Sequence, residues 1–362
     1  MYQKIRYLFL IVIIYFGACG IRGNENGNSA DPGSQTYTDI FNDDVEIIGL
    51  LYHRFDEQKY PSTSISKKLF REQMGFLKVN KFNVITFSEA IRKIRSVDEK
   101  GRFIVITIDD AFNSFMDNGF PILQEFGFKA TLFVNTETVG SNDYLNWTEL
   151  HSLIENGIEI GNHTHSHDYF LNMEVTLRHD AFIRDVNTAQ NIIIEKLEIT
   201  PEVFAYPFGE YDIQMKNNIK KMGFIGAAAQ NSGVMSGYSD PYALPRFPMT
   251  DLYGKMPVFK EKISMKALPV LETVPQSTIA LKNPPVLEIK LDNIDLEFGQ
   301  MQCFIQGGKC NITLVNDTNI HYRLTSDRAL TSRRHLYTIT IPDHANKNWY
   351  WYSYQWIFPG IK

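Results

Sequence analysis

The sequence predicts an α/β fold: a (β/α)7-8 barrel followed by a small all-β, sandwich-like domain. Between residues 45 and 250, short β-branched runs alternate with longer helical segments, a pattern typical of parallel strands buried on both faces. Seven or eight such units favour a closed barrel over an open sheet. After about residue 268 the helical periodicity stops and short alternating segments begin, which predicts the second domain.

The first half of the predicted barrel contains four strands and three helices. The helix predicted from residue 88 begins on Ser88 as its N-cap, because a serine hydroxyl can accept a hydrogen bond from the first helical turn. The strands are expected over 45–53, 82–86, 103–108 and 129–134, and the helices over 64–80, 88–96 and 121–127.

The second half repeats the alternation. Strands are expected over 158–160, 202–206 and 224–229, with a possible last one over 242–247, and helices over 148–157, 175–197 and 212–223. The predicted domains are therefore a barrel over residues 45–267 and a sandwich-like domain over residues 268–362. In parallel β/α folds, active sites lie at the carboxyl ends of the strands.

The N-terminus has the layout of a secretory signal. Residues 1–19 contain two basic residues, an unbroken apolar run and small residues before Cys19. Cys19 is placed like the acylated cysteine of a bacterial lipoprotein, and ordinary cleavage nearby is the alternative. Residues 20–44 are rich in Gly, Asn, Ser and Asp, which predicts a flexible tether. We expect export to the periplasm or cell surface, with membrane attachment through a lipid on Cys19.

The net charge limits the classes of binding partner, and the cysteine positions suggest a covalent link. The net charge of -5 and the lack of a basic patch argue against nucleic-acid binding. Cys303 and Cys310 flank a Gly-Gly turn signal, so a hairpin can bring them within bridging distance in an oxidising compartment. We expect a disulfide rather than two free thiols. The aromatic run over 349–356 suits either sugar stacking or packing inside the domain.

Polar residues gather where predicted strands end. Asp109 and Asp110 follow one strand, and three histidines at alternate positions, 163, 165 and 167, follow another. Separately, such residues are often turn formers or surface side chains. Together they offer the oxygen and imidazole ligands of a divalent metal and leave coordination positions open, which is the mark of a catalytic site.

Three motifs in order resemble those of the NodB-homology polysaccharide deacetylases, carbohydrate esterase family 4. They are "TIDDAF" at 107–112, "GNHTHSH" at 161–167 and "FAYPFGEYD" at 204–212. The resemblance implies that Asp109 is the general base and that Asp110, His163 and His167 bind one divalent ion, zinc being the first choice. His163 and His167 would share a face if the chain turns helically after the strand, which directs His165 elsewhere.

The third motif implies an oxyanion-binding loop. The resemblance assigns the donor N–H to Phe208, with Pro207 and Gly209 shaping the turn. Many family members begin this motif with an arginine, where this chain has Ala205.

The family's terminal Leu-x-His, which bears the general acid, is also absent after residue 224. The Tyr52-His53 pair near the start of the predicted barrel instead resembles the early Tyr-His of the circularly permuted subgroup that deacetylates biofilm poly-N-acetylglucosamine. His53 thereby becomes the acid, unless it is a structural histidine at a strand end. Arg246 becomes a substitute for the missing arginine, paired with Asp109.

The resemblance implies hydrolysis of acetyl groups, in the first place the N-acetyl groups of a GlcNAc-containing polysaccharide. Two alternatives stay open at this point. An O-acetyl glycan esterase would use the same water and oxyanion machinery with less need for an acid. A glycan-binding protein with a decayed active site is suggested by Ala111, where the family usually has Gly, and by the missing arginine.

Overall fold

The computed structural model describes residues 44–361. The predicted signal peptide, Cys19 and all but the last residue of the predicted tether lie outside this range. Within residues 44–361, no helix combines the length and apolar character needed to cross a membrane.

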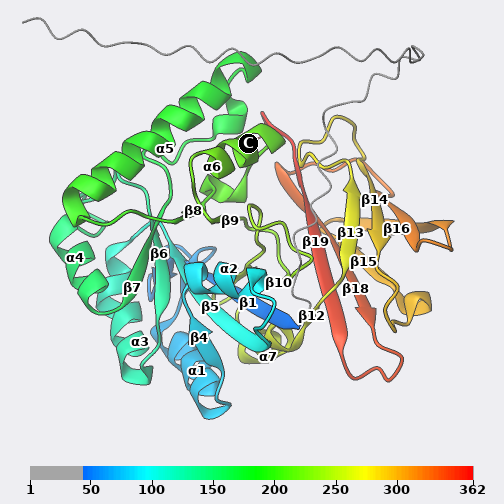
Figure 1. The fold of residues 1–362 in the computed structure, drawn as a ribbon, viewed down its shortest axis with the longest axis horizontal. Coiled ribbons are helices and arrows are strands. Elements are labelled where there is room, and N and C mark those ends of the chain that lie inside the picture. The colour runs from blue at the N-terminus through cyan, green and yellow to red at the C-terminus, as the bar shows by residue number, and fades with distance from the viewer. Residues whose placement is uncertain (1–43, 362) are drawn as a thin grey trace, which may run out of the picture. The chain divides into compact units, whose positions relative to one another are not determined.

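A curled, mainly parallel sheet carries the first part of the described chain (Figure 1). Its strands run in the order β10-β1-β5-β6-β7-β8-β9, with β11 paired to β1 and β4 paired to β5. Only β10 pairs antiparallel within this sheet. The bounds are β1 Val45–Tyr52, β4 Asn83–Ile85, β5 Gly101–Asp109, β6 Ala130–Val134, β7 Ile158–Asn162, β8 Val203–Ala205, β9 Gly226–Ala228, β10 Val234–Met235 and β11 Phe247–Pro248. The short strands β2 (Arg54–Phe55) and β3 (Ser64–Ile65) pair separately.

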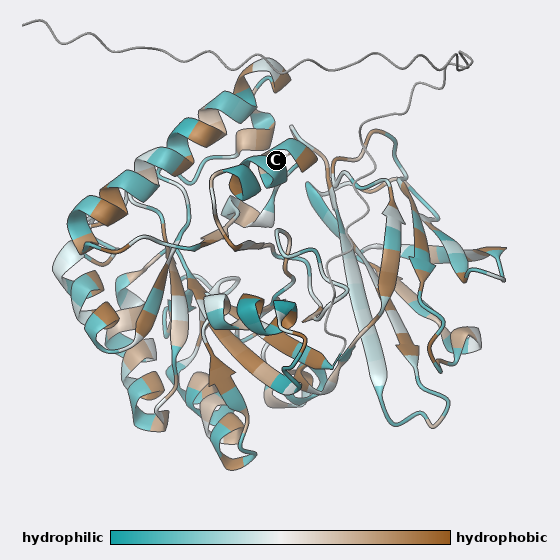
Figure 2. Ribbon diagram, viewed as in Figure 1, coloured by the Kyte–Doolittle hydropathy of each residue, from teal (hydrophilic) through white to brown (hydrophobic). Residues whose placement is uncertain are grey.

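Helices connect successive parallel strands and bury their apolar stripes against the sheet. Figure 2 shows apolar strands beside helices whose surfaces are part apolar and part polar, as the alternation in the sequence predicts. The helices are α1 Lys67–Val79, α2 Phe87–Arg95, α3 Phe120–Phe126, α4 Trp147–Glu155, α5 Val175–Leu197, α6 Ile213–Lys221 and α7 Met256–Ser264.

The start of α2 differs from the prediction. The N-cap is Thr86, whose hydroxyl accepts from the Glu89 N–H while the Glu89 carboxylate accepts from the Thr86 N–H. This reciprocal capping box satisfies two otherwise unpaired backbone donors, so the helix begins at Phe87. The prediction of Ser88 as the cap was wrong.

The sheet is a curled half-barrel whose two ends are linked by an irregular segment. Leu244 forms a parallel bridge with Ala228 of β9, and three residues later Phe247 pairs with Leu50 of β1. Residues 244–248 thus pair with β9 at one end of the sheet and with β1, next to β10 at the other end, without forming a regular strand throughout. A closed barrel of seven or eight complete units is not confirmed by this pairing.

The second sheet contains all the strands after residue 265 in one continuous order, β12-β19-β18-β15-β16-β17-β14-β13. Ile289 of β14 and Trp356 of β19 are far apart in this order yet share one buried apolar cluster, so the sheet curls over its own core. The predicted sandwich of two separate sheets is not confirmed. The bounds are β12 Lys266–Ala267, β13 Val270–Val274, β14 Val286–Leu291, β15 Gln302–Ile305, β16 Gly308–Asn316, β17 His321–Ser326, β18 Arg334–Pro342 and β19 Trp349–Ile357.

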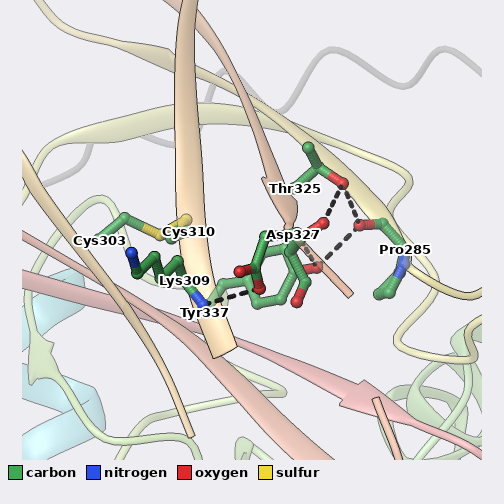
Figure 3. The surroundings of a disulfide bond; sticks show 8 residues. Pro285, Cys303, Lys309, Cys310, Thr325, Asp327 and Tyr337 are labelled. Carbon is green, nitrogen blue, oxygen red and sulfur yellow. Dashed lines mark hydrogen bonds between the residues drawn. A yellow bond between two sulfur atoms is a disulfide. The ribbon is translucent and has the colours of Figure 1, made fainter. Parts of the chain in front are cut away.

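A disulfide joins β15 to β16. Cys303 and Cys310 are bonded, with their Cα atoms 5.5 Å apart (Figure 3). Beside them, the Asp327 carboxylate accepts a hydrogen bond from the Lys309 N–H at 2.9 Å. The disulfide holds the hairpin between β15 and β16, and the Asp327 contact ties β16 to the residue after β17.

The aromatic strand β19 packs rather than presenting a sugar-binding face. Tyr354 and Trp356 are buried in the core of the second sheet. Trp351 contacts the ring of Phe247 in the first sheet, with centroids 5.5 Å apart. The packing interpretation of this strand therefore accounts for its aromatic residues.

Candidate metal centre and active site

Asp109 is the last residue of β5 and is held by an arginine. Arg246 donates to both Asp109 carboxylate oxygens, at 2.7 and 2.9 Å, and neither side chain is exposed to solvent. Arg246 also donates to the Thr107 hydroxyl at 3.0 Å and to the Ala229 carbonyl at 3.0 Å. The irregular segment 244–248 places this guanidinium beside β5 because it runs between β9 and β1.

The charge of Asp109 is set by these neighbours. Burial alone would raise the pKa of the Asp109 carboxyl, but the Arg246 guanidinium and His163 outweigh it and hold the pKa below its ordinary value. Asp109 is therefore an ionised proton acceptor throughout the neutral range. A bidentate guanidinium contact also fixes the plane of the carboxylate.

Three ligand-type side chains converge next to Asp109. The Nε2 atoms of His163 and His167 lie 3.5 and 3.3 Å from Asp110 Oδ1, and the potential ligand atoms of all three lie within 4.8 Å of one another. His163 Nδ1 lies 2.8 Å from the Ala205 carbonyl oxygen, which turns Nε2 toward Asp110. One carboxylate and two imidazoles in this arrangement fit a divalent ion with open coordination positions.

The two histidines have different proton affinities in this setting. Burial and the neighbouring His163 lower the pKa of His167 to about 4, so its ring is neutral and ready to act as a ligand. Burial would lower the pKa of His163 too, but its contact with Asp110 and the charge of Asp109 raise it above its ordinary value. Binding of an ion to His163 Nε2 therefore competes with protonation of that ring.

Left-handed backbone, rather than a helical turn, brings the ligands together. Non-glycine residues with positive φ include Asp110 (75°), Ala111 (56°), Thr164 (69°) and His167 (55°). Such residues cost about 1–2 kcal/mol each and cluster at functional sites. A helical turn after β7 was one way for His163 and His167 to share a face, but residues 163–169 form a non-helical loop. Ala111 adopts the left-handed conformation that glycine would take more readily.

His165 is held outside this cluster. Its Nδ1 lies 2.8 Å from the Thr136 hydroxyl, and its N–H donates to the Asp185 carboxylate at 2.7 Å. These contacts tie the loop to β6 and α5. His165 therefore has a position that supports the loop.

His53 lies directly after β1, whose neighbour in the sheet is β5. The structure places His53 among the charged groups of the site. Its pKa is raised by Asp110 and Asp109 and lowered by Arg246 and His163. Burial is the largest influence and lowers the pKa of His53 below its ordinary value, although the two carboxylates act in the opposite direction. A histidine at the end of the first strand thus shares the site with residues from β5 and β7.

The third motif forms a tight turn beside the ligands. Pro207–Gly209 is a short 3-10 turn in which Phe208 has a φ of 58°. The Phe208 ring centroid lies 4.5 Å from that of His167 and stacks on Tyr169 at 3.7 Å. Gly209 has a φ of 68°, and a Cβ there would lie 2.6 Å from the Gln230 backbone nitrogen. The turn therefore requires glycine at this position.

The second sheet holds this turn through contacts that the sequence analysis missed. Arg334 donates to the Phe208 carbonyl at 2.7 Å, and the Gln355 amide donates to the Gly209 carbonyl at 3.3 Å. Arg333 donates to both carboxylate oxygens of the buried Glu210, at 2.7 and 2.6 Å. The available signal was Glu210 inside the motif, which needs a cation when buried, and an Arg-Arg pair in the second domain.

Comparison with known proteins relates the region around this site to one family and one fold. Residues 96–227 match the family described as polysaccharide deacetylase. The chain carries a polysaccharide deacetylase domain. This family consists of hydrolases that release acetyl groups. The matched range contains Asp109, Asp110 and both proposed histidine ligands.

Individual relatives agree with this assignment. A poly-β-1,6-N-acetyl-D-glucosamine N-deacetylase of Staphylococcus aureus is 23% identical over 276 residues, covering 69% of this chain and 93% of that protein. Two solved structures share the deacetylase fold. The deacetylase PplD of Streptococcus pyogenes gives a TM-score of 0.55 at 18% identity, covering 60% of this chain and 98% of that one. IcaB of Ammonifex degensii gives a TM-score of 0.54 at 22% identity, covering 60% of this chain and 96% of that one.

Proposed function

We propose that this protein is a metal-dependent polysaccharide N-deacetylase that hydrolyses the N-acetyl groups of a GlcNAc-containing glycan to acetate and free amine. The observation that carries the proposal is the buried Asp109–Arg246 pair beside the cluster of Asp110, His163 and His167. It combines an oriented proton acceptor with a set of divalent-metal ligands. The Staphylococcus aureus relative, which is named for poly-N-acetylglucosamine, supports the same substrate class.

The proposed mechanism assigns one task to each residue. A divalent ion held by Asp110, His163 and His167, zinc being the first choice for this donor set, would polarise the acetyl carbonyl and acidify a water molecule. The Asp109 carboxylate takes a proton from the attacking water, and Arg246 keeps that carboxylate ionised and oriented.

The remaining steps concern the acetyl oxygen and the amine. The Phe208 N–H donates to the oxygen of the acetyl group as negative charge develops there, which is why a fixed turn with an unusual φ suits this position. His53 gives a proton to the departing amine nitrogen, because an amine is a poor leaving group when unprotonated.

We also propose that the protein acts outside the cytoplasm, in the periplasm or at the cell surface. The signal-like residues 1–19, the acylation-type position of Cys19 and the polar stretch that follows support this location. A lipid on Cys19 would keep the enzyme at the membrane, near an exported polysaccharide.

Acetate release tests the function directly. Purified protein is expected to release acetate from N-acetylglucosamine oligomers, and a chelator is expected to abolish the release until a divalent ion is restored. Acetylated xylan is the matched ester substrate. Release from xylan alone would identify an O-acetyl esterase, whereas sugar binding with neither acetate release nor bound metal would identify a glycan-binding protein.

Metal content tests the ligand assignment. The wild-type protein is expected to bind about one divalent ion per chain, and His163→Ala or Asp110→Ala to lose it, because either change removes one of three ligands. His165→Ala is the matched control in the same loop and should retain the ion. Metal analysis of dialysed protein gives the result. Loss of the ion in His165→Ala with retention in His163→Ala would overturn the assignment.

A further inference from the structure

A cavity of about 330 Å³ lies between the deacetylase domain and the second sheet. Phe208 and Gln230 line it on one side, and residues of β15, β18 and β19 and the residue after β15 line it on the other. Its volume lies at the lower end of the roughly 300–1,000 Å³ typical of small-molecule sites. Phe208 belongs to both the cavity and the candidate active site, because its ring also contacts His167. The two sites are therefore adjacent.

The lining of the cavity suits a carbohydrate. Amide groups of Gln230 and Gln306 can donate to and accept from sugar hydroxyl and acetamido groups. Aromatic rings offer flat apolar surface for the C–H face of a sugar, and Phe304 is 53% exposed although it lies on a strand.

The charge near the cavity distinguishes acetylated from free amino sugars. Arg334 lines the cavity, and no carboxylate is among its lining residues. Among residues 44–361, the carboxylate that pairs with Arg333 and Arg334 is that of Glu210, at 2.6 and 3.8 Å. One positive charge is thus in excess at this edge. A protonated glucosamine would be repelled, whereas a neutral N-acetylglucosamine would not.

We propose that this cavity is a second glycan subsite, which binds the polysaccharide next to the residue being deacetylated and favours neighbours that still carry their acetyl groups. The inference rests on the proposed function and extends it to the second sheet. That sheet then has two roles at the active site: its arginines hold the Phe208 turn, and its β15 side contacts the substrate chain.

The dependence of activity on substrate length tests the subsite. With N-acetylglucosamine oligomers from dimer to hexamer, wild-type kcat/KM should rise with length. Phe304→Ala and Gln306→Ala should each lower the hexamer-to-dimer ratio of kcat/KM about tenfold, which corresponds to about 1.4 kcal/mol. Phe304→Trp keeps an aromatic face and should keep the ratio. Leu314→Ala, at an exposed position of β16 outside the cavity, is the matched control.

Inhibition tests the charge preference. Fully deacetylated hexamers should inhibit the wild type about tenfold more weakly than acetylated hexamers, because of like-charge repulsion. Equal inhibition overturns that preference. A length dependence unchanged in both alanine variants, with unfolding transitions like that of the wild type, overturns the subsite. A wild-type protein with no activity on any oligomer overturns the proposed function instead.

Discussion

Replacing Asp109 with asparagine is expected to lower kcat on N-acetylglucosamine oligomers about 10²- to 10⁴-fold, the range for loss of a positioned general base. Asparagine has nearly the same shape as aspartate, but its neutral amide cannot take the proton of the attacking water. Metal content should stay near one ion per chain, because the three ligands are intact. Single-turnover acetate release together with metal analysis measures both quantities.

Loss of catalysis and loss of stability in Asp109→Asn must be distinguished. Asp109→Asn also leaves Arg246 buried without a counter-charge, and removing one partner of a buried ion pair costs about 3–5 kcal/mol of stability. Assays should therefore be made well below the unfolding transition. Asp212→Asn is the control, since Asp212 is a similarly buried carboxylate that caps α6. A folded, metal-loaded Asp109→Asn protein with near-normal kcat would contradict the assignment.

The alternation in the sequence predicted most of the parallel strands and their helices, because strands buried on both faces leave long apolar runs. It did not predict how the sheet ends. Residues 242–247 read as a candidate eighth strand, but Leu244 and Phe247 pair with different partners. The single sheet after residue 265 was also not predictable, because short alternating strands give the same pattern in one curled sheet as in two stacked sheets.

The sequence predicted which residues form the candidate site, but it did not predict the backbone geometry of the site. Strand-end logic and the three motifs selected Asp109, Asp110, His163 and His167, and the structure brings them together. The backbone that does so was not predictable, because a β-branched residue such as Thr164 rarely adopts a positive φ. Only the surrounding contacts, such as the Thr164 hydroxyl accepting from the His167 N–H at 3.1 Å, hold that conformation.

The contribution of the second sheet escaped prediction for a different reason. Arg333 and Glu210 are separated by 123 positions, and no local pattern specifies such a pairing. The motif predicted only that Phe208 needs a rigid turn. The structure supplies the rigidity from β18 and β19, which makes the second sheet part of the candidate active site.

His53 is the residue whose role depends most on the reaction. An acid must be protonated when the amine departs, and burial lowers the pKa of His53 below its ordinary value of about 6.5. The protonated fraction therefore falls as pH rises through this lowered pKa. Asp109 behaves in the opposite way: its lowered pKa keeps it ionised, and thus able to accept a proton, down to acidic pH. Activity limited by both groups should decline on the alkaline side because of His53.

Replacing His53 with alanine is accordingly expected to remove the alkaline limb of the kcat/KM profile and to lower kcat on N-acetyl substrates about 10²- to 10⁴-fold. The loss on an O-acetyl ester should be smaller, since an alkoxide leaves with less help from an acid than an amine does. His165→Ala is the control, because it changes a histidine of the same region while leaving the limb in place. Measuring both substrates across pH separates the roles: equal losses on amide and ester, with the limb intact, would show that His53 only supports the end of β1.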